Sequence, residues 1–314
     1  MNNIEIIGLG EVVVDWVTEL HHFPKPDEKI DALSENFFSG GVTANYLVAV
    51  SRLGVECGFI GAVGDDNYGD FLIKEFQKEK IDTNLILKIK NKKTPVNFIF
   101  VSEGEKTIIQ SPHMKTTKLS IQDISPSYIS KAKLLHTTLI HPDISKKAID
   151  IAKENDVKVS IDLEAQIALR GWNNLKDSLL KADILIPNEE GAKMITHAKT
   201  SKDAARVLVR KGIPIVIITR GREGAIITTS NIQKKVPVFK VKKVVDTTGA
   251  GDTFNAAFSV AFWIKKWDLE RACIFANAAA ALKIQHLGAR IGMPSIERIV
   301  NFLSEYDIDI FKMD

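Results

Sequence analysis

The stretch Val244-Val245-Asp246-Thr247-Thr248-Gly249-Ala250-Gly251-Asp252-Thr253-Phe254-Asn255-Ala256-Ala257-Phe258 decides how the chain is interpreted. A β-branched pair precedes two threonines, three small residues and an apolar pattern of helical period, which predicts a strand, a glycine turn and a helix. We expect Thr247 or Thr248 to cap the helix. The backbone amides of residues 249–251 would then be free at the positive end of the helix dipole, where an anion such as a phosphate binds.

Asp252 falls in the first turn of this expected helix, beside the position of the anion. A carboxylate there can accept the proton of an attacking hydroxyl, which is the role of a general base in phosphoryl transfer. The alternative is a helix N-terminus whose glycines serve close packing alone, and only the rest of the chain decides between the two.

The composition is that of a globular chain with balanced charge. Its 314 residues are 45% hydrophobic, and 42 basic against 39 acidic residues give a formal net charge of +3. No basic block with interleaved aromatic residues marks a nucleic-acid surface. Cys57 and Cys273 both lie in apolar surroundings, so we expect buried thiols and no disulfide framework. Since no leader-like N-terminus and no apolar run of about 18 residues occurs, we expect a soluble, cytoplasmic protein with no membrane partner.

Strand-like and helix-like segments alternate along most of the chain. A short apolar run from Ile4 to Asp15 predicts a buried parallel strand, and strand and helix patterns alternate again from Ala132 onward. This βαβ pattern favours a doubly wound α/β fold with a mostly parallel sheet flanked by helices. No composition break or long linker divides the chain, so we predict a single domain over residues 1–314.

Two segments do not follow this alternation. Residues 16–39 show weak strand-like alternation with no helical period, and residues 94–111 indicate a hairpin around Ser102-Glu103-Gly104-Glu105. We expect them to form a small β-sheet lid. A lid suits phosphoryl transfer because it excludes the water that would otherwise receive the phosphoryl group.

Polar residues and paired glycines suggest where a hydroxyl compound would bind. Asp15 ends the first predicted strand, where open α/β sheets place ligand groups. Gly40 and Gly41 precede a helix predicted to end at Leu53, and Asn45 lies within that helix. Glycines let backbone amides approach a ligand closely, and an asparagine side chain both donates and accepts hydrogen bonds.

Three other patterns are excluded as functional motifs. The first glycines resemble a dinucleotide fingerprint, but Val13 stands where its third glycine should be and no helix follows. A P-loop is excluded because no Gly-Lys pair occurs in the sequence. Asp65 or Asp66 could be mistaken for a metal ligand, but we expect one of them to cap a helix that ends near Gln77.

Asp246-Thr247-Thr248-Gly249-Ala250-Gly251-Asp252-Thr253-Phe254 resembles the second signature of the PfkB, or ribokinase-like, family of carbohydrate kinases, and Gly40-Gly41-Val42-Thr43-Ala44-Asn45 resembles the first. The resemblance spans nearly the whole chain. It implies an ATP-dependent sugar kinase that transfers the γ-phosphate to a hydroxyl of a ribose-, fructose- or ketose-like carbohydrate. Asp252 would be the general base, the amides of Gly249, Ala250 and Gly251 the anion hole, and Asp15, Gly40, Gly41 and Asn45 the sugar-binding residues.

The resemblance also implies where ATP and its cations bind. The nucleotide-binding residues would be Asn188, Thr219, Gly221, Gly224 and Asn277. Glu190 would bind Mg²⁺ through water, because Gly191 stands where the family has a glutamate, and Glu189 is the alternative. Acidic residues in a first helical turn also stabilise the helix dipole without any metal. A monovalent cation such as K⁺ would lie beside Asp246 and Thr248.

The acceptor is left open by departures from the family pattern at Thr43, Glu164 and Gln166. Relatives carry an arginine where Gln166 stands, so its absence favours a neutral or differently anchored substrate. The alternative within the same fold is a nucleoside kinase, which needs an aromatic clamp for the base. The candidates for that clamp are Trp16, Phe37, Phe38 and Phe98. An exposed edge of the lid would allow a homodimer.

Overall fold

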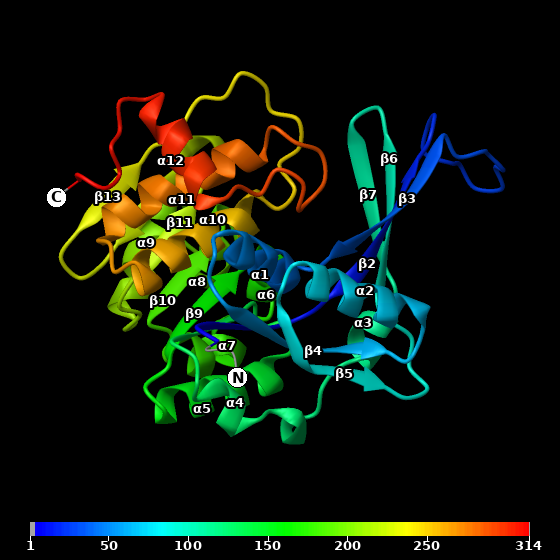
Figure 1. Cartoon of the computed structure of the whole chain (residues 1–314), viewed down its shortest axis with the longest axis horizontal. Helices are drawn as coiled ribbons and strands as arrows, with labels where there is room; N and C mark the ends of the chain where they lie inside the picture. The colour runs from blue at the N-terminus through cyan, green and yellow to red at the C-terminus, as the bar shows by residue number, and fades with distance from the viewer. Residues whose placement is uncertain (1–3, 314) are drawn as a thin grey trace.

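The computed structural model describes residues 4–313, which form two β-sheets with helices around the larger one (Figure 1). The larger sheet has the strand order β13-β12-β11-β10-β9-β8-β1-β4-β5, and the smaller has the order β3-β2-β6-β7. The strands of the larger sheet are β1 Ile6–Leu9, β4 Cys57–Gly64, β5 Asp82–Ile89, β8 Leu134–Thr137, β9 Lys158–Leu163, β10 Ile184–Pro187, β11 Val216–Thr219, β12 Ala225–Thr228 and β13 Gln233–Val236. Those of the smaller sheet are β2 Val13–Glu19, β3 Ser34–Gly40, β6 Val96–Ser102 and β7 Glu105–Gln110.

The helices follow the strands in alternation. They are α1 Val42–Arg52, α2 Asn67–Lys78, α3 His113–Thr116, α4 Pro126–Ile129, α5 Pro142–Glu154, α6 Ala165–Ala168, α7 Trp172–Leu179, α8 Glu189–Thr196, α9 Ser201–Arg210, α10 Ala250–Ser259, α11 Leu269–Lys283 and α12 Ile296–Ser304. A π-helical segment, Val260–Ile264, continues α10. The expected doubly wound, mostly parallel α/β fold is confirmed. Strand β1 pairs with β4 and β8 in parallel, and the antiparallel pairings of the larger sheet are β11 with β12 and β12 with β13.

The larger sheet is buried on both faces, which explains why its strands are continuous apolar runs. Successive side chains of a strand point to opposite faces, so Ile6 and Ile7 belong to two different hydrophobic cores. One core packs α1, α2, α10 and α11 against the sheet, and the other packs α5, α7, α8 and α9 against its opposite face. Cys57 and Cys273 are buried free thiols, as expected. Within residues 4–313, no helix is both long and apolar enough to cross a membrane.

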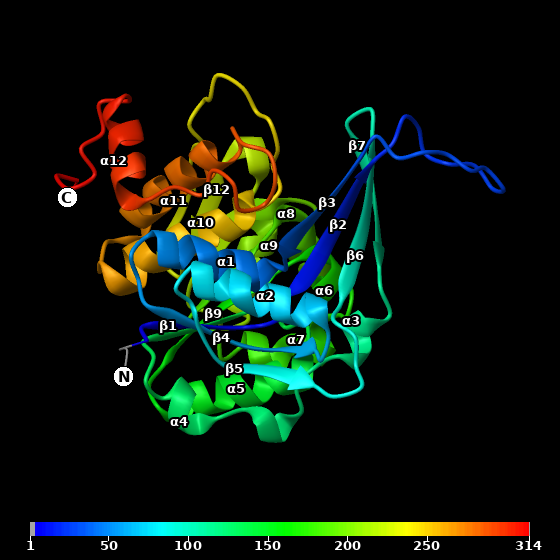
Figure 2. The ribbon, with the colours of Figure 1, turned by 45° about the vertical axis from the view of Figure 1, so that its right-hand side comes forward.

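The small sheet is the expected lid, and its strands project from one side of the molecule in both ribbon views (Figures 1 and 2). The expectation of a single first strand from Ile4 to Asp15 is wrong. The strand is interrupted at Gly10, so this segment forms two strands, β1 and β2. At Gly10 a Cβ atom would lie 2.0 Å from Thr43 Oγ1, so the chain turns there in close contact with α1. Asp15 consequently belongs to the lid sheet and not to the central one.

Of the two aspartates expected to cap this helix, Asp65 and Asp66, it is Asp66 that caps α2. Its Oδ1 accepts hydrogen bonds from the Gly69 amide (2.9 Å) and from Thr94 Oγ1 (2.6 Å), and its Oδ2 accepts one from the Thr94 amide (2.8 Å). It therefore joins the start of α2 to the segment that enters β6. Burial is the largest single influence on the pKa of Asp66, and it raises that pKa. The three hydrogen bonds together outweigh burial, so the pKa of Asp66 is lowered.

We expect Asp66→Ala to lower the free energy of unfolding by about 2–3 kcal/mol, because it removes a helix cap and two further hydrogen bonds. The matched control is Asp65→Ala, at the exposed neighbouring carboxylate, for which we expect a change within about 0.5 kcal/mol. Urea unfolding followed by circular dichroism measures both. Equal losses in the two variants would contradict the role assigned to Asp66.

Candidate active site

The glycine turn forms, but its cap differs from the expected one. Helix α10 begins at Ala250, and its N-cap is Gly249 in the left-handed region (φ 78°), with no capping side chain. The expectation that Thr247 or Thr248 caps the helix is therefore wrong. The Asp246 carboxylate closes the turn instead, since its Oδ1 accepts from the Thr248 amide (2.9 Å) and from Thr248 Oγ1 (2.7 Å). A side chain at Gly249 is excluded, because a Cβ there would lie 2.2 Å from the Ala289 carbonyl oxygen.

Of the three amides expected to be free, one is engaged within the turn. The Ala250 amide donates to the Thr247 carbonyl oxygen (3.1 Å) because the chain closes a tight turn before α10. Among residues 4–313, no acceptor is found for the amides of Gly249 and Gly251. A Cβ at Gly251 would meet nothing within 4 Å, so there is open space at this point of the turn. The turn can thus offer two amides to an anion at the N-terminus of α10.

Asp252 is buried (9% exposed), and its Oδ2 accepts a hydrogen bond of 2.8 Å from Asn45 Nδ2. Burial raises the pKa of Asp252 to about 7, although the Asn45 hydrogen bond lowers it. The neighbouring carboxylates of Glu164 and Glu11 raise the pKa further, and the Arg290 guanidinium lowers it. A carboxylate with a pKa near neutrality is well matched to a proton-accepting role.

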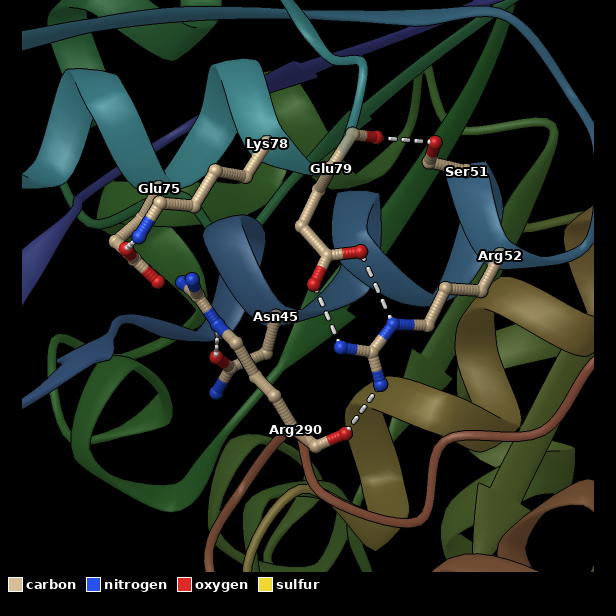
Figure 3. Close-up of polar contacts among 7 residues, drawn as sticks. All are labelled: Asn45, Ser51, Arg52, Glu75, Lys78, Glu79 and Arg290. Atoms are coloured by element: carbon tan, nitrogen blue, oxygen red, sulfur yellow. Dashed lines mark hydrogen bonds and ion pairs between the residues drawn. The ribbon is translucent and has the colours of Figure 1, made fainter.

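A chain of hydrogen bonds fixes the orientation of Asn45 (Figure 3). Arg290 Nε donates to Asn45 Oδ1 (2.9 Å), so the Asn45 amide group must turn its NH₂ toward Asp252. Arg52 Nη1 donates to the Arg290 carbonyl oxygen (2.6 Å). Arg52 is itself held by Glu79 through two bonds, from Nε to Oε2 (3.0 Å) and from Nη2 to Oε1 (2.6 Å). Burial lowers the pKa of Arg290 to about 10, with Glu79 and Asp15 opposing, so Arg290 stays charged at neutral pH.

The sequence interpretation missed Arg290 and a group of buried carboxyls around Asp252. Burial, together with Glu164, Asp252 and Glu11, raises the pKa of Asp162 well above its ordinary value. Asn255 Nδ2 partly compensates by donating to Asp162 Oδ2 (2.8 Å). The position of Asp162 and Glu164 at the end of β9 could have indicated this group, because neighbouring parallel strands end at the same edge of a sheet. No local pattern marks Arg290, which lies 245 residues from Asn45.

The lid brings Asp15 and the paired glycines together. Asn97 Nδ2 of β6 donates to Asp15 Oδ1 (2.8 Å), and a Cβ at Gly40 would lie 2.1 Å from Asp15 Oδ2. Gly41 has φ 103°, and a Cβ there would lie 2.6 Å from the Glu11 carbonyl oxygen, so this position requires glycine. Burial raises the pKa of Asp15, opposed first by the Asn97 hydrogen bond and then by Arg290 and Lys106.

The tip of the lid reaches the glycine turn. Lys106 Nζ of β7 donates to Thr248 Oγ1 (3.4 Å), although the two residues are 142 positions apart. A lysine side chain of the lid therefore reaches the segment that precedes α10. A lysine here adds positive charge next to the amides of Gly249 and Gly251.

Four of the five residues expected around the nucleotide lie at or just after the ends of β10 and β11, and the fifth, Asn277, lies on α11. Asn188 Oδ1 caps α8 by accepting from the Gly191 amide (2.7 Å), and Asn188 forms an isolated bridge with Thr219. Gly221 and Gly224 both have positive φ in the turn between β11 and β12. Asn277 Nδ2 donates to the carbonyl oxygens of Val236 (3.3 Å) and Pro237 (2.9 Å), so its NH₂ group is already hydrogen-bonded within the fold. A contact of Asn277 with adenine stays a prediction.

The glycine at position 191 has a steric cause. A Cβ atom there would lie 2.6 Å from the Leu163 carbonyl oxygen, so no glutamate fits without a shift of the backbone. Of the two glutamates before it, Glu189 is engaged by Lys193 (2.7 Å) and by Ser201 Oγ (2.6 Å). Glu190 is the remaining candidate. In the part of the chain that the structure describes, no group of three His, Cys, Asp or Glu side chains is placed to hold a metal ion.

The fold and the site together define a carbohydrate kinase, a phosphotransferase that uses an alcohol group as acceptor. The chain belongs to the pfkB family of carbohydrate kinases, whose family model matches residues 1–296. A ribokinase from Haemophilus influenzae is 32% identical over 305 residues, which are 94% of this chain and 97% of the relative. The chain is accordingly an ATP-dependent sugar kinase similar to ribokinases.

Two solved structures agree with this assignment. A ribokinase from Thermotoga maritima matches with a TM-score of 0.82 at 30% identity, covering 96% of this chain and 99% of that chain. A protein named ribokinase II from E. coli, solved in complex with ATP and Mg²⁺, matches with a TM-score of 0.83 at 26% identity, covering 96% of this chain and 99% of that chain. The expected fold and family are confirmed.

The raised pKa of Asp252 predicts an unusual dependence of stability on pH. Its ordinary pKa of 3.8 applies to the unfolded chain, and in the folded chain the pKa is about 7. Between these values the unfolded state binds fewer protons, so the free energy of unfolding falls as pH rises, by up to about 1.4 kcal/mol per pH unit.

We expect the melting temperature of Asp252→Asn to rise relative to the wild type as the pH increases from about 5 to 8, because this variant carries no carboxyl that must ionise in the interior. The control is Asp65→Asn, an exposed carboxylate, whose difference from the wild type should stay constant over the same range. Differential scanning calorimetry measures both. A melting-temperature difference between Asp252→Asn and the wild type that stays constant with pH would show that burial does not raise the pKa of Asp252.

Proposed function

We propose that this kinase phosphorylates a hydroxyl of a small pentose- or ketose-like sugar, with Asp252 as the general base. The observation that carries this proposal is the Asp252 carboxyl itself. It is buried, has a pKa of about 7, and stands in the first turn of α10 beside the free amides of Gly249 and Gly251. The reaction uses residues from both ends of the chain, which supports one domain over residues 1–314.

Proton transfer and charge stabilisation are assigned to different groups. Asp252 accepts the proton as the acceptor oxygen attacks the γ-phosphorus and the bond to ADP breaks. The amides of Gly249 and Gly251 donate to the oxygens of the transferred group, and Ala250 supplies the turn that positions them. Because the transition state of phosphoryl transfer is loose, the base does not need to be strong. Lys106 and the rest of the lid exclude water from this reaction.

The acceptor would bind between the lid and α1. Asp15 and Asn45 present acceptor and donor groups to sugar hydroxyls, and Gly40 and Gly41 allow close approach of the backbone. The arrangement of the lid strands favours a sugar over a nucleoside. Trp16 pairs with Phe37 and Phe98 across the strands, so these three aromatic residues share the face opposite to Asp15. Their rings pack against one another, with Trp16 4.9 Å from Phe37 and 5.7 Å from Phe98 between centroids.

Phe38 is the one aromatic candidate that pairs directly with Asp15 and shares its face of the lid, and it is 40% exposed. One ring cannot clamp a base from two sides, which makes a nucleoside the second choice. A nucleoside is kept as the alternative acceptor because Phe38 lies on the same face of the lid as Asp15.

ATP would bind along Asn188, Thr219, Gly221 and Gly224, with Asn277 near the adenine. The donor set fits an Mg²⁺ ion that arrives with the nucleotide, because Mg²⁺ keeps several waters and takes phosphate oxygens as ligands. Glu190 would hold it through water. When bound, Mg²⁺ supplies positive charge that neutralises the phosphate oxygens. The choice of ATP and Mg²⁺ as ligands is supported by the similar E. coli protein that was solved in complex with both.

We expect Asp252→Asn to bind Mg²⁺-ATP with an affinity near that of the wild type but to lose turnover by about 10²- to 10⁴-fold, because the proton acceptor is removed and the anion-binding turn is kept. Isothermal titration calorimetry and an ADP-release assay measure the two quantities. Asp65→Asn is the control and should keep both. Near-normal turnover in Asp252→Asn would refute the assignment of the base.

The acceptor is identified by an ADP-release screen over pentoses, ketoses, sugar acids and nucleosides. We expect the highest kcat/KM for a neutral pentose or ketose. A nucleoside that ranked first would replace the sugar as acceptor, and no activity with any of them would overturn the proposed reaction.

We also propose a homodimer formed through the lid. Strands β3 and β7 are the free edges of the small sheet, and β7 carries two exposed apolar residues, Ile108 (48%) and Ile109 (55%). Exposed apolar edge strands tend to pair with another chain.

We expect size-exclusion chromatography with light scattering to give the mass of a dimer for the wild type. The double variant Ile108→Lys/Ile109→Lys should give a monomer, because like charges then face each other across the edge. The control Lys147→Glu lies on α5, away from the lid, and should stay dimeric. A monomeric wild type would contradict the proposal.

A further inference from the structure

A lysine ammonium lies directly behind the glycine turn. Lys283 is the last residue of α11, and none of its surface is exposed (0%). Fully buried lysines are rare unless they are paired, so this one requires an explanation. Its Nζ donates to the carbonyl oxygen of Asp246 (3.1 Å) and to that of His286 (3.4 Å). The ammonium is therefore coordinated by backbone carbonyls from two different segments.

These two segments are the ones that shape the anion-binding turn. The amides of Val245 and Asp246 donate to the Ile284 carbonyl oxygen (2.8 and 3.2 Å). The Gly288 amide donates to Asp246 Oδ2 (2.8 Å). The segment after α11 and the segment before α10 are thus held together around Lys283. Gly249 packs against Ala289 of the same region, so a displacement here would move the N-terminus of α10.

The surroundings of Lys283 are those of a monovalent cation. Carbonyl oxygens form its contacts, and the Asp246 and Asp252 carboxylates favour its charged form, although burial lowers its pKa. The family resemblance places K⁺ beside Asp246 and Thr248. A diffusible cation does not fit next to an ammonium that already uses the Asp246 carbonyl, because two like charges in a buried site repel each other.

We propose that the Lys283 ammonium takes the place of the monovalent cation in this chain, and that the kinase therefore needs neither K⁺ nor Na⁺. Lys283 is a positioning residue: it holds the segments around Asp246 and His286 together and so fixes the amides of Gly249 and Gly251. The consequence for activity rests on the proposed function, but the consequence for stability does not.

The test compares the wild type with Lys283→Ala, which removes the ammonium and leaves its space beside the Asp246 carbonyl open to a diffusible cation. Each protein is melted, and its ADP release is assayed, in about 100 mM of K⁺, Na⁺ or choline salts at equal ionic strength. Lys243→Ala is the matched control, because Lys243 is an exposed lysine in the segment that leads into Asp246. Should Lys283→Ala fail to fold, Lys283→Ser serves the same test, since its short side chain also leaves that space open.

For the wild type and Lys243→Ala we expect the same melting temperature and the same kcat in all three salts. For Lys283→Ala we expect a lower melting temperature in choline that K⁺ raises in a saturable way, as ligand binding to the folded state requires. Its kcat should rise at least about fivefold from choline to K⁺, with little change in the KM for ATP, since the effect is on the anion-binding turn.

Two results would overturn the proposal: a saturable, K⁺-specific stabilisation or activation of the wild type, and a lysine variant whose stability and activity match the wild type in every salt. The melting experiments need no acceptor sugar. They therefore test the role of Lys283 even where no tested compound is phosphorylated. A failure of the proposal for Lys283 can thus be distinguished from a failure of the proposed reaction.

Discussion

The hydrogen bond between Asn45 and Asp252 is the interaction on which the rest of the site depends. It spans 2.8 Å between buried side chains that are 207 residues apart in the sequence. It joins α1, which follows the lid, to α10, which begins at the anion-binding turn. A carboxylate buried with no donor would stay protonated, and one exposed to water would lose its basicity. The Asn45 amide keeps Asp252 between these limits, with a pKa of about 7.

The supports of this bond lie outside the site and are charged. Arg290 fixes the direction of the Asn45 amide, and Arg52 with Glu79 fixes the backbone of Arg290. Charges in a protein interior are tolerated only when they are paired and hydrogen-bonded. Arg52 has such a partner in Glu79, whereas the buried Arg290 is held by its Nε bond to Asn45 Oδ1 and leaves its Nη2 without a hydrogen-bond partner among the described residues. The carboxyls of Asp162 and Asp252 each accept a hydrogen bond from an asparagine. The interior is therefore arranged for electrostatics as much as for packing.

The sequence was sufficient where the signal is local. The turn at Gly249, the helix after Gly41, and the alternation that gives the parallel sheet all follow from residues that are neighbours in the chain. Prediction failed where a distant group decides the outcome. Asp246 caps the turn in place of the threonines because Gly288 also binds it, and Gly10 breaks the first strand because Thr43 crowds it. Arg290 and Lys283 act only through contacts that folding creates, so no pattern reveals them.

Arg290 and Lys283 both act at the start of α10, because the charge of Arg290 lowers the pKa of Asp252 and the Lys283 ammonium donates to the Asp246 carbonyl oxygen. This arrangement bears on how the site reaches its working geometry. Catalysis by electrostatics is most effective when donors and charges are in place before the substrate arrives. A covalently attached ammonium at Asp246 is always in place, whereas a bound ion must be recruited from solution and its site is filled only in part at low concentration. A permanent charge at this position requires the burial of a lysine side chain. The hydrogen bonds around Asp246 offset that desolvation, so the same contacts that stabilise the turn also keep its charge permanent.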